Sequence, residues 1–143
     1  GDVQPRAYRV RTAFFWSLLV GGFALTIFTL AELPYDAAAR TAGKAQVVEV
    51  KGLQWQWELS RSEVTAGQPV EFRVTAGDVN HGMGIYDKTL QLLAQVQAMP
   101  GFTNRLVYTF AEPGTYRLLC LEYCGLVHHE MISELKVTAA PSP

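Results

Sequence analysis

The sequence has few cysteines, no long basic run and no internal repeat, and each absence excludes a class of protein. Two cysteines among 143 residues are too few for a disulfide framework. The net charge is −1, and no Lys/Arg-rich stretch occurs beyond a short N-terminal cluster, so no nucleic-acid partner is expected. No alternation of strands with helices indicates a βαβ architecture. The chain has room for one domain and one further element.

A run of 20 uncharged residues, Thr12 to Ala31, follows Arg6, Arg9 and Arg11. A helix of about 20 apolar residues matches the hydrocarbon core of a bilayer, and Pro34 is expected to end it. Basic residues mark the cytoplasmic side, so the remainder is expected outside a bacterial or archaeal cytoplasmic membrane. The predicted organisation is a cytoplasmic N-terminus at 1–11, a single transmembrane helix at 12–33, a linker at 34–45 and a periplasmic domain at 46–143.

Two other interpretations of the apolar run stay open. A cleaved signal peptide has a shorter apolar segment, of about 7–15 residues, but the alanines at 37–39 resemble a cleavage site. A buried core helix is the second alternative. The length of the run favours an uncleaved anchor.

The chain from Gln46 onward has the pattern of a β-domain. Short runs rich in Val, Leu, Thr and aromatic residues alternate apolar with polar positions, as half-buried strands do. Turn signals containing Pro and Gly separate several of these runs. About seven strands at this spacing predict an all-β sandwich or barrel. The predicted strands cover residues 46–50, 53–59, 70–76, 105–110, 115–121 and 131–139.

Soft metal ligands are concentrated in one stretch of the predicted domain. Cys120 and Cys124 are followed by His128 and Met131 within 12 residues. Thiolate, imidazole and thioether groups are the ligands that copper prefers. Thiolates bind in the deprotonated form, so the metal itself favours ionisation of the cysteines. His81, just past a predicted strand where a loop would begin, is the best candidate for a further ligand from a distant segment.

Each of these residues also has an ordinary structural interpretation. Cys120 and Cys124 form a disulfide in the main alternative, because the outer compartment is oxidising. His128 then lies on the surface, Met131 packs in the core as the first residue of a strand, and His81 belongs to an ordinary loop. Zinc is the rival metal, but methionine is not a usual zinc ligand. His129 is interpreted as a non-ligand whose side chain points away from its neighbour's.

The pattern C-x-E-x-C-G-x-x-H-x-x-M, with D-V-x-H upstream, resembles the CuA signature of subunit II of haem-copper oxidases. The resemblance implies a cupredoxin-like Greek-key sandwich or barrel outside the membrane. It also implies a binuclear copper centre bridged by the thiolates of Cys120 and Cys124. One copper would add His81 and Met131. The other would add His128 and the backbone carbonyl of Glu122.

The resemblance assigns further roles around the centre. Electrons would enter the domain at Trp55, with Trp57 second, although one of the two is expected to pack in the core because alternate strand residues face opposite ways. The family often has His where Leu53 stands here. Asp78 is a candidate partner of the His81 region or, equally, a plain turn residue. Gly125 is expected to permit the tight loop after the second thiol.

The implied partners are a haem-copper catalytic subunit I in the membrane and a c-type cytochrome or similar periplasmic electron donor. Catalysis would belong to subunit I, so no residue of this chain is expected to act as acid, base or nucleophile. The single helix resembles B-type oxidases, whereas H-G-M-G-I-Y-D resembles chains of copper-containing nitric oxide reductases. The resemblance leaves a magnesium ion at the Glu122 carboxylate open. A copper chaperone or sensor and a metal-free tethered domain are the alternatives from other classes.

Overall fold

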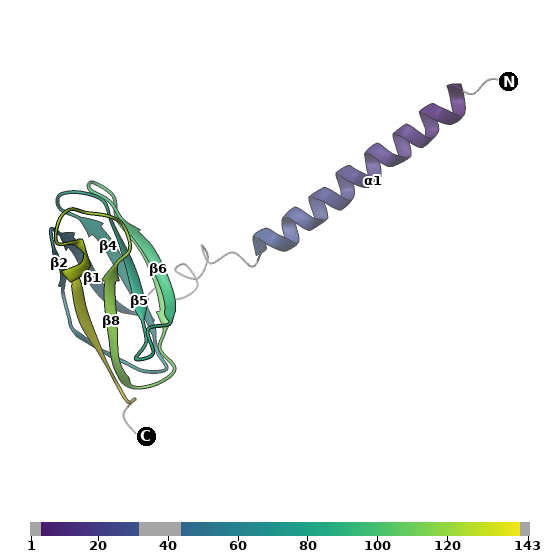
Figure 1. The fold of residues 1–143 in the computed structure, drawn as a ribbon. Coiled ribbons are helices and arrows are strands. Elements are labelled where there is room, and N and C mark those ends of the chain that lie inside the picture. The colour runs from purple at the N-terminus through teal and green to yellow at the C-terminus, as the bar shows by residue number, and fades with distance from the viewer. Residues whose placement is uncertain (1–3, 32–43, 141–143) are drawn as a thin grey trace. The chain divides into compact units, whose positions relative to one another are not determined.

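The computed structural model describes residues 4–31 and 44–140, which fall into two separate units, a helix and a β-domain. The helix α1 spans Gln4–Ala31, so it begins within the segment predicted as a cytoplasmic N-terminus (Figure 1). Most of the predicted linker and the last residues of the predicted transmembrane helix lie outside the described residues. The limits of the membrane crossing therefore stay a prediction.

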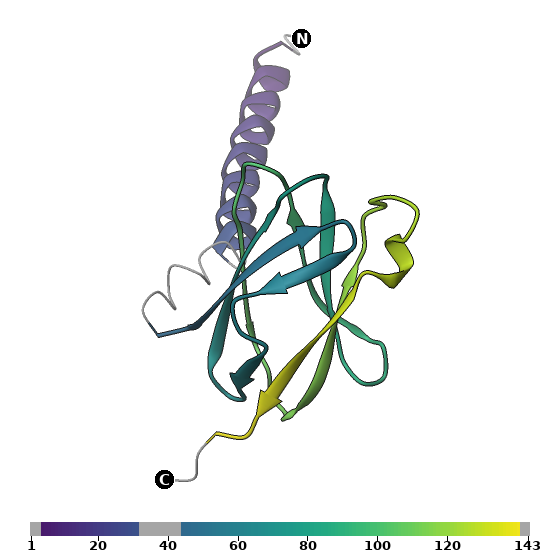
Figure 2. The same cartoon turned by 90° about the vertical axis from the view of Figure 1, so that its left-hand side faces the viewer.

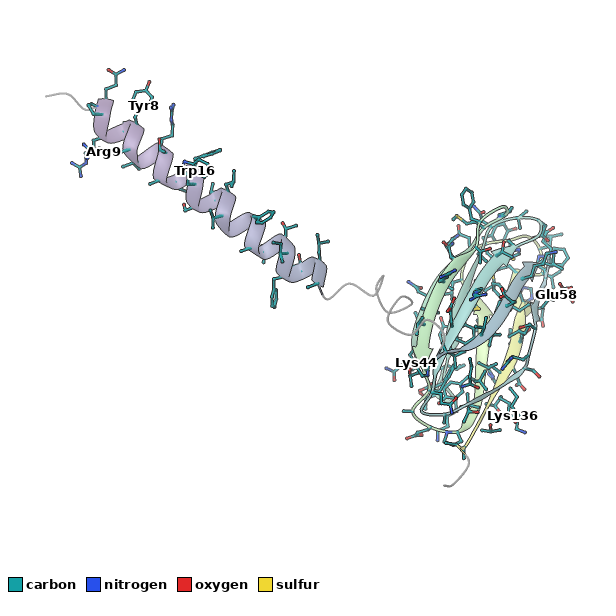
Figure 3. The ribbon with its side chains drawn as sticks, turned by 180° about the vertical axis from the view of Figure 1, so that it is seen from behind. Tyr8, Arg9, Trp16, Lys44, Glu58 and Lys136 are labelled. Carbon is teal, nitrogen blue, oxygen red and sulfur yellow. The ribbon has the colours of Figure 1, made fainter. Side chains whose placement is uncertain are left out.

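The composition of α1 suits an apolar surrounding. The helix is long and apolar enough to cross a membrane, and none of its residues is buried. The hydroxyls of Ser17, Thr26 and Thr29 donate to carbonyls three or four residues earlier, at 2.8–2.9 Å, so they need no water. The Arg11 guanidinium lies 4.5 Å from the ring centroid of Tyr8, which projects near the N-terminal end in Figure 3.

Nine strands and one short 3-10 helix make up residues 44–140. The strands form two packed sheets (Figures 1 and 2). The predicted all-β sandwich is confirmed, with more strands than the seven expected. The bounds are β1 Gln46–Leu53, β2 Gln56–Leu59, β3 Glu63–Thr65, β4 Pro69–Ala76, β5 His81–Tyr86, β6 Leu92–Ala98, β7 Asn104–Thr109, β8 Gly114–Cys120, the 3-10 helix His128–Glu130 and β9 Ile132–Thr138.

Consecutive strands share a sheet in three cases, β1–β2, β5–β6 and β8–β9, and the chain crosses to the other sheet at each remaining step. One sheet has the order β2-β1-β4-β7 and the other β3-β9-β8-β5-β6. β1 pairs parallel with β4 and β3 parallel with β9, while the remaining pairs are antiparallel. The chain therefore passes repeatedly between the sheets, and loops far apart in sequence meet at each end of the sandwich.

Two local predictions about strands are wrong. The run 53–59 is not one strand: β1 continues to Leu53, the chain turns at Gln54 and Trp55, and β2 returns antiparallel. His81 does not lie in a loop but is the first residue of β5. β5 escaped prediction because five of its six residues are buried, and its two glycines lie under Leu121, so no alternation marks it.

The core lies between the sheets and reaches both ends of the sandwich. Inward-facing residues of β1, β4, β5, β8 and β9 are buried, among them Val48, Phe72, Ile85, Leu118 and Leu135. At one end, Phe110 contacts the rings of Phe72, Tyr108 and Tyr116, with centroids 4.6–6.3 Å apart. At the other end, the buried side chains include His81, Cys120, Cys124 and Met131.

Candidate metal centre

The centre forms where three chain segments meet at one end of the sandwich. β5 begins at His81, β8 ends at Cys120, and the β8–β9 loop continues to Met131. This loop, yellow-green in Figure 2, lies at the same end as the blue β1–β2 hairpin. The backbone of Cys120 donates to the Met131 carbonyl at 3.2 Å, and Leu121 donates to the Gly82 carbonyl at 2.7 Å. These bonds close the loop and attach it to β5.

The two cysteines form the middle of the centre. The Sγ atoms of Cys120 and Cys124 are 3.8 Å apart, and both residues are buried free cysteines. A disulfide requires an S–S distance of about 2.05 Å, so the structure does not contain the alternative disulfide. The buried thiols instead point at each other across a short gap.

Four further donor groups contact the two sulfurs. His81 Nδ1 lies 3.8 Å from Cys120 Sγ, and His128 Nδ1 lies 3.5 Å from Cys124 Sγ. The Glu122 carbonyl oxygen is 3.2 Å from Cys120 Sγ, and Met131 Sδ is 3.8 Å from Cys124 Sγ. The structure thus brings together all the ligands implied by the resemblance. Met131 lies just before β9, fully buried.

Neighbouring residues orient His81. Its Nε2 lies 2.8 Å from Asp78 Oδ1, which fits a tautomer that donates from Nε2 and leaves the Nδ1 lone pair facing Cys120. The backbone N–H groups of Gln54 and Val79 also donate to the Asp78 carboxylate, each at 2.6 Å. Partial burial raises the pKa of Asp78, but the hydrogen bonds from His81, Gln54 and Val79 outweigh it and hold that pKa below its ordinary value.

Burial favours the protonated thiol of Cys124 when no metal is bound. It raises the pKa of Cys124 to about 11, and the neighbouring Cys120 adds to the increase. A metal cation reverses this preference, because it stabilises the thiolate directly. Binding of a metal cation at this site would therefore release the thiol proton of Cys124.

The donor groups present fit a copper site. His81, Cys120 and Cys124 have ligand atoms within 4.8 Å of one another, and all three are buried. Metal–thiolate bonds are about 2.3 Å long, so one ion can contact two sulfurs 3.8 Å apart. Two thiolates, two imidazole nitrogens and a thioether are a softer set than zinc sites use.

The two tryptophans of the β1–β2 hairpin differ in environment. Trp57 is buried, and its ring meets that of His81 edge-on at 5.9 Å, so it is the core-packing member of the pair. Trp55 is partly buried. A Cβ at Gly125 would lie 3.1 Å from Trp55 Nε1, and Gly125 itself has a φ of 126°, a conformation that favours glycine. Leu53 lies against Gly77.

Two residues near the centre were not singled out from the sequence. The ring of exposed Tyr123 lies 6.0 Å from that of His128, and the side chain of Gln54 donates to the Cys124 carbonyl. Tyr123 lies inside the ligand motif, but aromatic residues in loops are common. Gln54 precedes Trp55, and nothing local connects it to a loop 70 residues away. His129 has an exposed side chain, 3.4 Å from Glu130.

Fold and site together define a cupredoxin-like domain with a copper-type ligand cluster, preceded by an apolar helix. The family model "Cytochrome C oxidase subunit II, periplasmic domain" matches residues 58–138, which is more than half of the chain. The chain belongs to the cytochrome c oxidase subunit II family, the electron-accepting subunits of these oxidoreductases.

Individual relatives support this membership. A cytochrome c oxidase subunit 2 of Thermus thermophilus is 31% identical over 104 residues, covering 73% of this chain and 74% of the relative. A heme-copper oxidase subunit 2 of Aeropyrum pernix is 31% identical, covering 79% of this chain and 53% of the relative.

Solved structures show the same fold. The periplasmic domain of subunit II of cytochrome oxidase of Bradyrhizobium japonicum has a TM-score of 0.60 at 18% identity, covering 69% of this chain and 88% of that one. A chain of a heme-copper terminal oxidase dimer has a TM-score of 0.59 at 23% identity, covering 92% and 99%.

Proposed function

We propose that the chain carries a binuclear copper centre and relays electrons to a haem-copper catalytic subunit, with no catalytic centre of its own. The observation that carries the proposal is the pair of free buried thiols 3.8 Å apart, each with a histidine Nδ1 within 3.8 Å of its sulfur. The proposed ligands are His81, Cys120, Cys124, His128, Met131 and the Glu122 carbonyl. Two metal ions sharing both sulfurs would use every one of these donors.

The centre, when bound, supplies a site that takes up and releases one electron. The chain holds its ligands on a rigid scaffold, because β5 and β8 are neighbouring strands and the loop is closed by backbone hydrogen bonds. Little movement of ligands on electron transfer favours fast relay. The apolar residues around the sulfurs exclude water and tune the potential.

The membrane arrangement proposed is a single crossing by α1 with its arginine-rich end in the cytoplasm. This orientation is supported by Arg6, Arg9 and Arg11 at one end of the helix. The β-domain then lies on the periplasmic side, where a c-type cytochrome or similar donor would meet Trp55. The ring of the buried Trp57 lies beside that of His81. The reported relatives are named as oxidases, which favours oxygen over nitric oxide as the terminal acceptor.

A magnesium ion at Glu122 is a separate proposal. The Glu122 side chain is exposed, while its carbonyl faces Cys120. Glu122 also lines a surface hollow of about 370 Å³ with Gly82, Gln95 and Gln97. Carboxylate and amide oxygens suit magnesium, and the partner subunit would complete the site.

Copper stoichiometry and electron-spin spectroscopy test the main proposal. The full-length chain in detergent micelles, loaded with copper, is expected to bind two coppers per chain with one unpaired electron shared by both. A single copper with a mononuclear spectrum would instead support a chaperone or sensor. Binding of no copper would contradict any copper function.

A further inference from the structure

Gln54 contacts both halves of the proposed copper centre from the β1–β2 turn. Its backbone N–H donates to Asp78 Oδ2 at 2.6 Å, and the other oxygen of that carboxylate lies 2.8 Å from His81 Nε2. Its side-chain Nε2 donates to the carbonyl oxygen of Cys124, also at 2.6 Å. One residue therefore connects the histidine on β5 with the second cysteine of the loop.

The side-chain amide of Gln54 packs closely against the loop at Gly125. A Cβ placed on Gly125 would lie only 3.0 Å from Gln54 Nε2, so the amide fills the space that a side chain at 125 would need. The Gln54 amide is thus held directly against the peptide that follows Cys124.

The two contacts join segments from different sheets. The β1–β2 hairpin belongs to one sheet, whereas His81 and Cys120 belong to β5 and β8 of the other. The ligand loop joins β8 at Cys120 and β9 just after Met131, and Cys124 lies between these two anchored ends. The position of Cys124 therefore depends on what binds the middle of the loop, and a short hydrogen bond to its carbonyl fixes that peptide.

We propose that Gln54 is a positioning residue whose side-chain amide holds the Cys124 peptide in a fixed place relative to the Asp78–His81 pair, and so sets the geometry of the copper site. This inference rests on the proposed function. Residues that hydrogen-bond around a metal site and orient its ligands affect metal affinity by about 10- to 100-fold. Without the amide donor, the Cys124 loop is free to shift away from His81 while the sandwich itself remains intact.

Substitution of Gln54 in the full-length chain tests the inference. Gln54→Met keeps the length of the side chain without a donor, and Gln54→Glu places an acceptor against the carbonyl. Gln56→Met is the matched control, because Gln56 is exposed on β2 and its side chain contacts Glu58 at 3.4 Å. The measurements are the rate of copper loss to excess chelator, the electron-spin spectrum, and thermal unfolding of the copper-free protein.

Both Gln54 variants are expected to lose copper about tenfold faster than wild type and to change the copper hyperfine pattern, with copper-free unfolding nearly unchanged. Gln56→Met should match wild type in all three. Unchanged copper loss and spectrum in the Gln54 variants would overturn the inference. Copper-free variants that unfold or are strongly destabilised would overturn it too, because they would show a general structural role. If wild type binds one copper, the proposed function fails, while the rates still report on Gln54.

Discussion

Two residues of this chain, His81 and Met131, pack in the core and also belong to the candidate metal centre. Met131 and His81 are fully buried, yet both present ligand atoms to the cysteine sulfurs. Their side chains are fixed by packing before any metal arrives. Buried polar groups need partners, and His81 obtains one from Asp78. Pre-organisation at the centre is thus a property of the sandwich core.

Replacing Met131 separates its two roles. Met131→Leu conserves volume in the core, which costs less than about 1.5 kcal/mol, but removes a weak thioether ligand. Both coppers are expected to remain, while the electron-spin spectrum and reduction potential change. Leu135→Met, a swap of similar volume at an equally buried residue of β9, is the control and should leave the spectrum as it is. Complete loss of copper from Met131→Leu alone would contradict the assigned role.

Gly125 supports a second prediction at this scale. Gly125→Ala combines an unfavourable φ with a contact of about 3 Å to the Gln54 amide, so it should displace the loop and reduce copper retention. Gly101→Ala shares the positive φ, at 77°, but has open space around it. Copper retention and unfolding of both variants are measured. Equal copper retention in the two would show that the contact with Gln54 has no effect on the site.

The candidate ligands that could be grouped from sequence alone are those that lie close together along the chain. The spacing of Cys120, Cys124, His128 and Met131 indicates a metal site by itself, because one loop carries all four. His81 could be named as a candidate from its residue type, but its place at the start of a strand could not, since β5 has no strand periodicity. Gln54 could not be predicted, because its role appears only when the hairpin packs on a loop 70 residues further on.

At the scale of elements, the β1–β2 hairpin shows why the architecture near the centre was hard to predict. The run 53–59 alternates like a strand, but the backbone of Gln54 hydrogen-bonds Asp78, and the chain reverses there. The hydrogen bond to Asp78, 24 residues away, thus outweighs the strand propensity of the local sequence at this turn. Strands β1, β4, β7, β8 and β9 were predicted, whereas the short β3, the largely buried β5 and the seven-residue β6 were not. The metal end depends on the unpredicted elements, so the fold class was easier to predict than the architecture of the site.

The β5–β6 turn, remote from the ligands, gives a pH-dependent prediction. Asp87 accepts hydrogen bonds from the Thr89 hydroxyl at 2.7 Å, from the Thr89 N–H at 2.8 Å and from the Gln91 N–H at 2.9 Å. The Thr89 hydroxyl and the Gln91 N–H chiefly lower the pKa of Asp87 below 3.8. A lowered folded-state pKa means that this stabilisation is present above pH 3.8 and lost as the pH falls through the folded-state value.

Asp87→Asn is therefore expected to lower the free energy of unfolding at neutral pH and to weaken its fall on acidification. Urea unfolding of the copper-free chain across pH measures both effects. Glu134→Gln, at an exposed carboxylate on β9, is the control. An identical pH slope in Asp87→Asn and wild type would rule out the turn as a source of pH dependence.

At the scale of the whole molecule, the chain has a small net charge, and exposed apolar side chains lie in the ligand loop. The net charge is −1, and Tyr123 and Leu126 in the ligand loop are 77% and 86% exposed. Weak charge limits long-range steering of a partner. Association with an electron donor is then expected to depend on apolar contact at this end of the domain.

Raising the salt concentration should therefore slow electron uptake from a reduced c-type cytochrome only slightly. Leu126→Ser should slow electron uptake markedly, because the substitution removes exposed apolar area. Stopped-flow kinetics measures both. Leu90→Ser, in the β5–β6 turn, removes a comparable exposed side chain away from the ligand loop and serves as control. A steep salt dependence would show that charged groups dominate the encounter.

The two histidines of the candidate centre differ in burial, so the centre is more accessible to solvent from one side than from the other. His81 is closed in by the core, while His128 is only partly buried beside exposed Tyr123. Solution ions and small chelators therefore have access through the His128 side. Copper arriving from solution would therefore reach the partly buried His128 before His81, which the core encloses. Under the proposed function, the centre would accordingly assemble from the side of His128. His81, the ligand already fixed by the fold, would engage last.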